Sequence, residues 1–333
     1  MKVLLTGGTG FLGRRLAERL APRHDLVMLV RPTSDRSGLP AAATLVEGAV
    51  SDRESLARAA DGCAAVVHAA ALVKILAPKS EFDRINVSAL DHLIDLAPQL
   101  DRAIYVSSFI ALGPTERLPG GTADESTPPL GPHGRRKRWI NHYERTKTQA
   151  DARARQAIDA GAPLSVVYPG VVYGPGAMTE GNIVVRHLLD LAGGRLPGLL
   201  GRPHRRWNYV FVEDAADGIR RVLEEAAPAS RYCLGGENVT QERFYELVAE
   251  VGGIDVPTRR IPDRVARAAG LLSREWARVT RSTPQLTPDL VEIYRHDWAL
   301  SSERAGEDLG YRPRSLREGL EETIAWLREK GAW

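Results

Sequence analysis

Residues 6–13 read TGGTGFLG and lie between an apolar run at 2–5 and a helix-like run at 14–20. Glycine tolerates positive φ angles, and because it lacks a Cβ its backbone N–H groups can approach phosphate oxygens closely. The helix that follows directs its positive end at such an anion. The spacing is G-x-x-G-x-x-G rather than G-x-G-x-x-G, and a tight turn alone would also explain it. The strand–loop–helix setting favours a dinucleotide site that comprises Gly7, Thr9, Gly10, Phe11, Leu12 and Gly13.

Short apolar strands alternate with helices through the first half of the chain. This alternation predicts an α/β fold, namely a Rossmann-type doubly wound parallel sheet that is covered by helices on both faces. Ligands of such sheets bind at the carboxyl ends of the strands, where the glycine loop lies. We expect strands at 2–6, 25–30, 43–47, 64–68, 103–106 and 164–168, and helices at about 10–21, 51–60, 81–97 and 142–160.

The alternation of strands and helices ends after Gly174. Gly, Pro and Arg become frequent there, and helical patterns then dominate. We predict an NADP-binding Rossmann domain at 1–175, to which residues 207–227 return. Residues 176–206 and 228–333 would form a smaller, mainly helical C-terminal substrate lobe. The segment 177–206 has enough leucine and valine, including Val184, Leu188 and Leu199, to line an apolar pocket together with a helix near 262–280.

That helix is amphipathic. Apolar residues such as Val265, Leu272 and Trp276 alternate with arginines such as Arg267 and Arg278. We interpret it as a lid helix with a solvated basic face. Docking on a membrane surface is the alternative.

Bulk composition limits the class of protein. An apolar share of 43% and a charged share of 26% are typical of a soluble globular chain, and the net charge of +3 with scattered arginines indicates no nucleic-acid partner. Cys63 and Cys233 lie far apart, which fits a reducing cytoplasm. We expect no signal peptide and no stable membrane insertion. His187, His204 and His296 show no ligand spacing, so we assign no metal.

Four polar side chains suggest acid–base chemistry. Tyr143 and Lys147 are four residues apart in a predicted helix and therefore share one face. A phenol has a pKa of about 10, and a nearby ammonium group lowers it by stabilising the phenolate. Ser107 and Ser108 follow a strand, so they stand on the ligand side of the sheet. A hydroxyl there can bind a substrate oxygen while the tyrosine moves its proton.

The combination resembles the extended short-chain dehydrogenases/reductases of the NAD-dependent epimerase/dehydratase family, and the likeness covers nearly the whole chain. Within them it most resembles the dihydroflavonol-reductase-like branch, and the closest likeness is to plant farnesol dehydrogenases. The matching stretches are TGGTGFLG at 6–13, HAAA at 68–71, YVSSFIALG at 105–113, YERTK at 143–147, YPGVVYGPG at 168–176 and FVEDAADG at 211–218.

The resemblance implies a role for each matching residue. Ser108 would hold the reacting oxygen, Tyr143 would be the acid/base, and Lys147 would activate Tyr143 and anchor a ribose. Asn86 resembles the helix asparagine near the nicotinamide, although it could equally be an ordinary polar helix residue. Ala69 and Ala70 would lie under the adenosine ribose, and Pro169 and Val172 would form the wall beside the carboxamide.

The end of the second strand bears on the choice of cofactor. An NAD site usually carries a carboxylate there, bonded to the ribose hydroxyls. This chain instead has Arg31, whose guanidinium would pair with a 2′-phosphate. We therefore expect NADP(H). Asp35 could still reach a ribose, so NAD(H) stays the alternative.

Three functions remain open. The leading one is an NADP(H)-dependent oxidoreductase that interconverts an alcohol and a ketone or aldehyde on a lipophilic small molecule, and the resemblance implies a homodimer. The second is a sugar-nucleotide epimerase or dehydratase with tightly bound NAD(P). Its substrate diphosphate would need cations, which Arg195, Arg202, Arg205 and Arg206 could supply. The third is a binding protein that senses the cofactor, and the intact Ser108 and Tyr143 argue against it.

Overall fold

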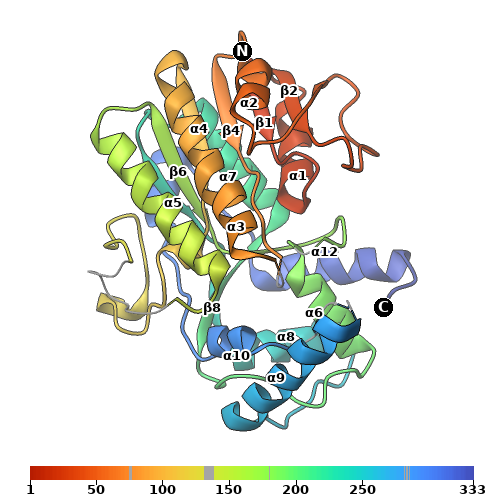
Figure 1. Cartoon of the computed structure of the whole chain (residues 1–333). Helices are drawn as coiled ribbons and strands as arrows, with labels where there is room; N and C mark the ends of the chain where they lie inside the picture. Colours follow the sequence, from red (N-terminus) through yellow and green to blue (C-terminus); the bar gives the residue numbers. More distant parts are fainter. Residues whose placement is uncertain (75–76, 131–138, 180, 281, 283, 285) are drawn as a thin grey trace.

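A seven-stranded parallel sheet forms the upper half of the molecule (Figure 1). The structure is a computed structural model that describes residues 1–74, 77–130, 139–179, 181–280, 282, 284 and 286–333. The strand order β3-β2-β1-β4-β5-β6-β9 reverses between β1 and β4, which is where doubly wound sheets bind their ligands. The strands are β1 Lys2–Thr6, β2 Asp25–Val30, β3 Thr44–Glu47, β4 Ala65–His68, β5 Arg102–Val106, β6 Leu164–Pro169 and β9 Arg231–Leu234.

Helices cover both faces of this sheet, because almost every residue of its strands other than the edge strand β3 is buried and both faces need apolar cover. One face packs Leu56, Leu93 and Ala150 of three helices against the strands. The other face packs Leu16 and Ile219 in the same way. The helices on the first face are α2 Arg53–Ala60, α4 Ala89–Leu96 and α5 His142–Asp159. The helices on the other face are α1 Phe11–Leu20, α7 Val212–Glu224 and α11 Glu303–Leu309.

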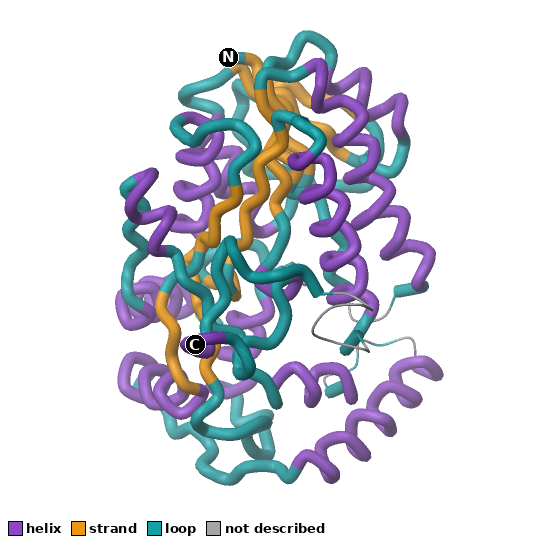
Figure 2. Tube along the Cα trace, turned by 90° about the vertical axis from the view of Figure 1, so that its left-hand side faces the viewer, coloured by secondary structure: helices purple, strands orange, loops and turns teal. Residues whose placement is uncertain are grey.

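The lower half of the molecule is mainly helical and surrounds a small second sheet (Figure 2). Its core is aromatic, with Tyr209 stacked on Phe244 at a ring-centroid distance of 4.6 Å. The sheet has the order β10-β8-β7. Its strands are β7 Val171–Tyr173, β8 Arg206–Phe211 and β10 Glu237–Thr240, and the helices are α6 Ile183–Ala192, α8 Gln241–Gly252, α9 Asp263–Thr280, α10 Pro288–Tyr294 and α12 Leu316–Glu329.

The predicted fold class is confirmed, and the differences are local. The helix expected at 81–97 consists of α3 (Lys79–Phe82), a π-helical turn at Asp83–Ser88 and α4. Strand β9 and helix α11 fall in the range expected for the substrate lobe, yet β9 pairs with β6 and α11 packs on the large sheet. The division of the chain into two lobes at the predicted boundaries remains a proposal.

Two expectations about the substrate lobe need correction. Val184, Leu188 and Leu199 are buried in the core of the lower half rather than exposed along a pocket. Helix α9 does not bury its large apolar side chains as we predicted, since Leu272 and Trp276 are exposed, whereas arginines such as Arg267 and Arg278 are exposed as expected. The helical period alone could not tell which side of this helix faces the protein. Across the described residues, no helix is long and apolar enough to cross a membrane.

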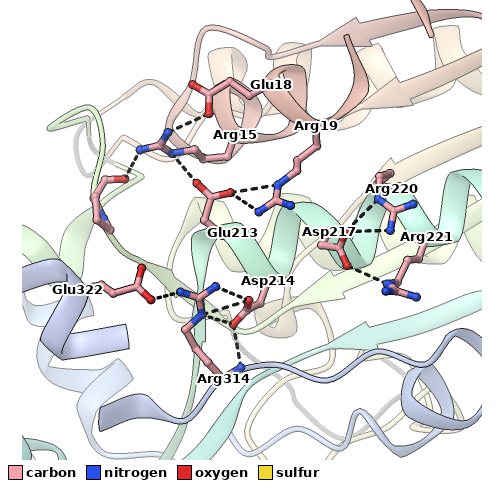
Figure 3. Close-up of polar contacts among 11 residues, drawn as sticks. Arg15, Glu18, Arg19, Glu213, Asp214, Asp217, Arg220, Arg221, Arg314 and Glu322 are labelled. Carbon is pink, nitrogen blue, oxygen red and sulfur yellow. Dashed lines mark hydrogen bonds and ion pairs between the residues drawn. The ribbon is translucent and has the colours of Figure 1, made fainter. Parts of the chain in front are cut away.

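Ion pairs tie the chain's last helix to the start of α7 (Figure 3). Arg314 donates from its backbone N–H to Asp214 at 2.9 Å and from Nε to the same carboxylate at 3.1 Å. Its guanidinium also stacks over the Phe211 ring, 4.2 Å from the centroid, and pairs with Glu322. On the opposite side of α7, Glu213 pairs with arginines of α1. The FVEDAADG segment is thus held from both sides, and with it the end of β8.

Candidate active site

The glycine loop is shaped by close backbone contacts. Gly7 has a φ of +75°, and a Cβ there would lie 2.5 Å from the Ala70 nitrogen. A Cβ on Gly13 would lie 2.0 Å from the Gly7 oxygen. A Cβ on Gly10 would approach only that same oxygen, at 3.2 Å, among the described residues. Gly7 and Gly13 therefore serve the close packing of β1, β4 and α1, while Gly10 leaves its outer side open for a ligand.

Helix α1 starts at this loop without a side-chain cap. Gly10 is its N-cap, so the first N–H groups of the helix receive no side-chain oxygen. Helices α2, α5, α8, α10 and α12 are each capped by a side chain. The free donors and the positive helix end suit a diphosphate. The predicted loop residues Thr9, Phe11 and Leu12 all lie at this turn.

The corner after β2 carries several arginines. Arg31 directly follows the strand and is exposed. Asp35 accepts hydrogen bonds from the Ser37 hydroxyl at 2.7 Å and from Arg14 at 2.9 Å. The Ser37 bonds, followed by the Arg14 charge, lower the pKa of Asp35. The Asp35 carboxylate already has partners within the protein and is therefore poorly suited to bind ribose hydroxyls. The exposed Arg31 is better suited to bind a phosphate.

Ser108 and Tyr143 meet at the carboxyl edge of the sheet. Ser108 lies just beyond β5 and caps a 3-10 turn, accepting the Ile110 N–H at 3.4 Å. Asn141 caps α5 by accepting the Glu144 N–H at 2.8 Å, which places Tyr143 in the first turn. Burial raises the pKa of Tyr143 to about 12, and a hydrogen bond with the Ser108 side chain opposes this shift. The phenol is therefore protonated at neutral pH.

Lys147 lies one turn further along α5 and is buried. Its Nζ donates to the Val106 carbonyl at 3.0 Å and to the Tyr105 hydroxyl at 3.4 Å, and it lies 5.0 Å from the centroid of the Tyr105 ring. Burial lowers the pKa of Lys147 to about 7. Tyr105 was not predicted as a site residue, although it stands on the face of β5 that packs against α5.

Asn86 is buried in the π-helical turn and joins two segments. Its Oδ1 accepts the Leu72 N–H at 2.7 Å, and its Nδ2 donates to the Leu72 carbonyl and to the Thr146 hydroxyl, both at 3.1 Å. Thr146 directly precedes Lys147. The amide thus fixes the chain after β4 against α5, which is a positioning role consistent with a place near the cofactor.

The remaining predicted residues border the same edge. Ala69 donates its N–H to the Thr6 carbonyl at 3.1 Å, and Ala70 donates to the Thr6 hydroxyl at 3.4 Å, so both lie beside the glycine loop. The Thr6 hydroxyl also bonds the His68 ring at 2.9 Å. Pro169 ends β6, the neighbour of β5, and Val172 follows in β7.

A hollow of about 480 Å³ opens at the start of α5. It mixes aromatic and aliphatic side chains with charged ones, so it can admit an organic molecule with a polar group. Its lining residues are Lys79, Trp139, Ile140, Asn141, His142, Arg145 and Asp289.

Three of the four arginines considered for a substrate diphosphate are bonded to the protein itself. Arg195 pairs with Asp190 at 2.8 Å, and Arg205 reaches Asp297 at 3.4 Å. Arg206 donates to the Gly121 carbonyl at 2.8 Å. Arg202 is exposed. These groups do not form a ready-made clamp. In the described part of the chain, His, Cys, Asp and Glu form no cluster that could hold a metal ion.

The fold and this edge define a dinucleotide-dependent short-chain dehydrogenase/reductase: an uncapped helix behind a glycine loop, a serine after strand β5, and a tyrosine and a lysine on the neighbouring helix α5. The model of the NAD dependent epimerase/dehydratase family matches residues 3–235, and the chain belongs to this family. It is an oxidoreductase of the extended type that acts on CH–OH groups with a nicotinamide dinucleotide. The narrower likeness to plant farnesol dehydrogenases stays a prediction.

Individual relatives match over almost their whole length. Sterol demethylase protein B of Methylococcus capsulatus is 27% identical over 340 residues, which cover 99% of each chain. A 4-hydroxy-2-methyl-3-oxo-4-farnesyl-3,4-dihydroquinoline-1-oxide ketoreductase of Stigmatella aurantiaca is 28% identical over 96% of this chain and 95% of its own. The crystal structure of gox2253 is 31% identical with a TM-score of 0.81, over 99% of this chain and 98% of that one.

Proposed function

We propose that this protein is an NADP(H)-dependent oxidoreductase that interconverts an alcohol and a ketone or aldehyde on a lipophilic small molecule. The observation that carries the proposal is the hydrogen-bonded pair Ser108–Tyr143 at the sheet edge, with Lys147 one turn away. The homodimer and the cytoplasmic location expected from the sequence remain predictions.

The chain's own residues would handle the substrate oxygen. The nicotinamide, when bound, supplies or accepts the hydride. In the reducing direction, the Ser108 hydroxyl holds the carbonyl oxygen and the neutral Tyr143 phenol donates a proton to it. In the oxidising direction, Tyr143 must first lose its proton, and its raised pKa makes this step more favourable at high pH. The Lys147 ammonium, which is buried on α5, would bind the ribose of the cofactor.

Cofactor choice rests on the corner after β2. Arg31 is exposed there, while the carboxylate of Asp35 is engaged by Arg14 and Ser37. A 2′-phosphate would find a guanidinium and no free acidic competitor at this strand end. This arrangement supports NADP(H) over NAD(H).

Two observations support net redox on an apolar substrate over internal redox on a nucleotide sugar. Arg195, Arg205 and Arg206 are bonded to acceptors of the protein, which leaves them poorly placed to clamp a diphosphate. One relative is named for a ketoreductase acting on a farnesylated ring compound.

The test is turnover against lipophilic ketones, the corresponding alcohols and nucleotide sugars, followed by nicotinamide absorbance. We expect NADPH consumption with a ketone and none with nucleotide sugars. Conversion of a nucleotide sugar without net absorbance change, by enzyme that retains its cofactor through purification, would decide for the epimerase.

A further inference from the structure

Helix α9 exposes a row of large apolar side chains. Their spacing of seven, four and three residues places them on one side of the helix, which has a period of 3.6 residues. Single exposed apolar residues are common on protein surfaces, but a continuous row marks a contact surface. The row consists of Val265, Leu272, Trp276 and Val279, whose exposed fractions are 57%, 74%, 70% and 81%.

A different side of α9 faces the protein. Ala266, Gly270 and Ala277 are its buried residues. Gly270 packs so closely on α10 that a Cβ there would lie 2.9 Å from the Pro288 nitrogen. The inward contact is thus complete with small side chains, and the large apolar ones are left outside it. We refer to Val265, Leu272, Trp276 and Val279 as the outer row.

The other sides of α9 carry basic side chains, away from the outer row. The helix carries arginines at 264, 267, 274 and 278 and acids only at 263 and 275, so its net charge is +4 − 2 = +2. Arg278 and Arg274 share the single carboxylate of Glu275, at 2.7 and 3.5 Å. A basic helix with an exposed apolar side containing tryptophan matches helices that lie in the interface of an anionic bilayer.

The position of α9 relates the outer row to the active site. In Figure 1, α9 lies at the lower edge of the molecule, with α10 between it and the end of α5. Asp289 on α10 lines the hollow at the start of α5, and its carboxylate interacts electrostatically with both Arg274 of α9 and His142 of α5. A surface that received the outer row would therefore lie near the entrance of this hollow.

We propose that α9 docks the enzyme on the surface of a bilayer that contains anionic lipids, with the outer row in the interface and the arginines at the headgroups. A second copy of the chain is the less suitable occupant, because two α9 helices that each carry a net positive charge repel one another, whereas an anionic surface attracts them. An anionic bilayer would neutralise the positive charge of α9 with its headgroups and would also bury the outer row.

The test measures sedimentation of the full-length enzyme with vesicles, one set of phosphatidylcholine and another of phosphatidylcholine mixed with an equal amount of phosphatidylserine. We expect binding to the mixed vesicles that weakens with salt. The double variant Leu272→Glu, Trp276→Glu should lower the partition coefficient at least about tenfold. Arg264→Gln should lower it about fivefold on the mixed vesicles, since Arg264 is exposed and each basic residue near such a surface contributes about 1 kcal/mol.

Leu45→Gln is the matched control, because Leu45 is an exposed apolar residue of β3 in the other half of the molecule. It should sediment like the wild type. The milder pair Leu272→Ser, Trp276→Ser repeats the test with small side chains. Failure of the wild type to sediment with either vesicle, or sedimentation that no outer-row variant reduces, would overturn the proposal. A concentration-dependent dimer lost in these variants would identify a second copy as the occupant. No substrate is present, so the result is independent of the proposed catalytic function.

Discussion

Replacing Tyr105 by phenylalanine should shift the pH range over which the enzyme binds NADPH. The Lys147 ammonium donates to two acceptors, the Val106 carbonyl at 3.0 Å and the Tyr105 hydroxyl at 3.4 Å. The substitution removes the second acceptor and keeps the ring, whose centroid lies 5.0 Å from Nζ. The ammonium form then loses stabilisation while the neutral amine does not, so the pKa of Lys147 falls.

The size of this shift follows from the geometry. Hydrogen bonds to charged groups contribute about 1.5–3 kcal/mol, and at 3.4 Å the bond is longer than the usual range, so we take about 1 kcal/mol. One pKa unit corresponds to about 1.36 kcal/mol, so the pKa should fall by roughly 0.7. Burial already places the pKa of Lys147 at about 7. Because the ammonium form is the ribose donor, affinity is full at low pH and is lost as pH rises through this value.

The assay is the dissociation constant for NADPH, measured by fluorescence titration at a series of pH values. The midpoint of the loss should lie near pH 7 in the wild type and about 0.7 lower in Tyr105→Phe. Tyr232→Phe is the control, since it removes a tyrosine hydroxyl that bonds Asp308 at 2.9 Å on the far strand β9. Identical midpoints in wild type and Tyr105→Phe, or a shift to higher pH, would refute the role given to Tyr105.

Three further substitutions test other parts of the structure. Arg31→Ala should weaken NADPH binding by about 1.5–3 kcal/mol and leave NADH binding unchanged, whereas Arg36→Ala should affect neither; equal losses for both cofactors would remove Arg31 from the phosphate site. Arg314→Met should lower the free energy of unfolding in urea by about 1–3 kcal/mol, because the largely buried Asp214 carboxylate keeps its backbone hydrogen bond but loses its guanidinium partner; a change under about 0.5 kcal/mol would contradict this. Asn86→Ala should lower kcat and the melting temperature together, since the amide joins two segments; a loss of kcat at full stability would place it in the chemistry instead.

Most strands of the large sheet could be predicted because the sequence pattern of each strand lies within the strand itself. Fully buried parallel strands appear as continuous apolar runs, and the glycine loop is a single segment between β1 and α1. Strand β9 was missed, because Arg231–Leu234 is a short run in a region of helical patterns and joins the sheet through pairing with the distant β6. Short runs of this kind cannot be told from loops without knowledge of their partner strand.

The candidate site likewise contains residues that local sequence patterns predict and residues that they do not. Ser108, Tyr143 and Lys147 follow from local spacing and from their place on a strand end and a helix. Tyr105 becomes part of the site only because α5 packs across β5, which brings together residues 42 positions apart in sequence. The orientation of α9 also depends on packing, since a helical period identifies an apolar side but not what covers it.

The most direct test is turnover of Tyr143→Phe with NADPH and the best ketone of the panel, measured beside NADPH affinity. The substitution keeps the ring and removes the oxygen that bonds Ser108. The proposed chemistry predicts a fall in kcat of about 10²–10⁴-fold, the usual contribution of a general acid, with little change in the dissociation constant for NADPH. Turnover close to that of the wild type would contradict the assignment of Tyr143 as the proton donor.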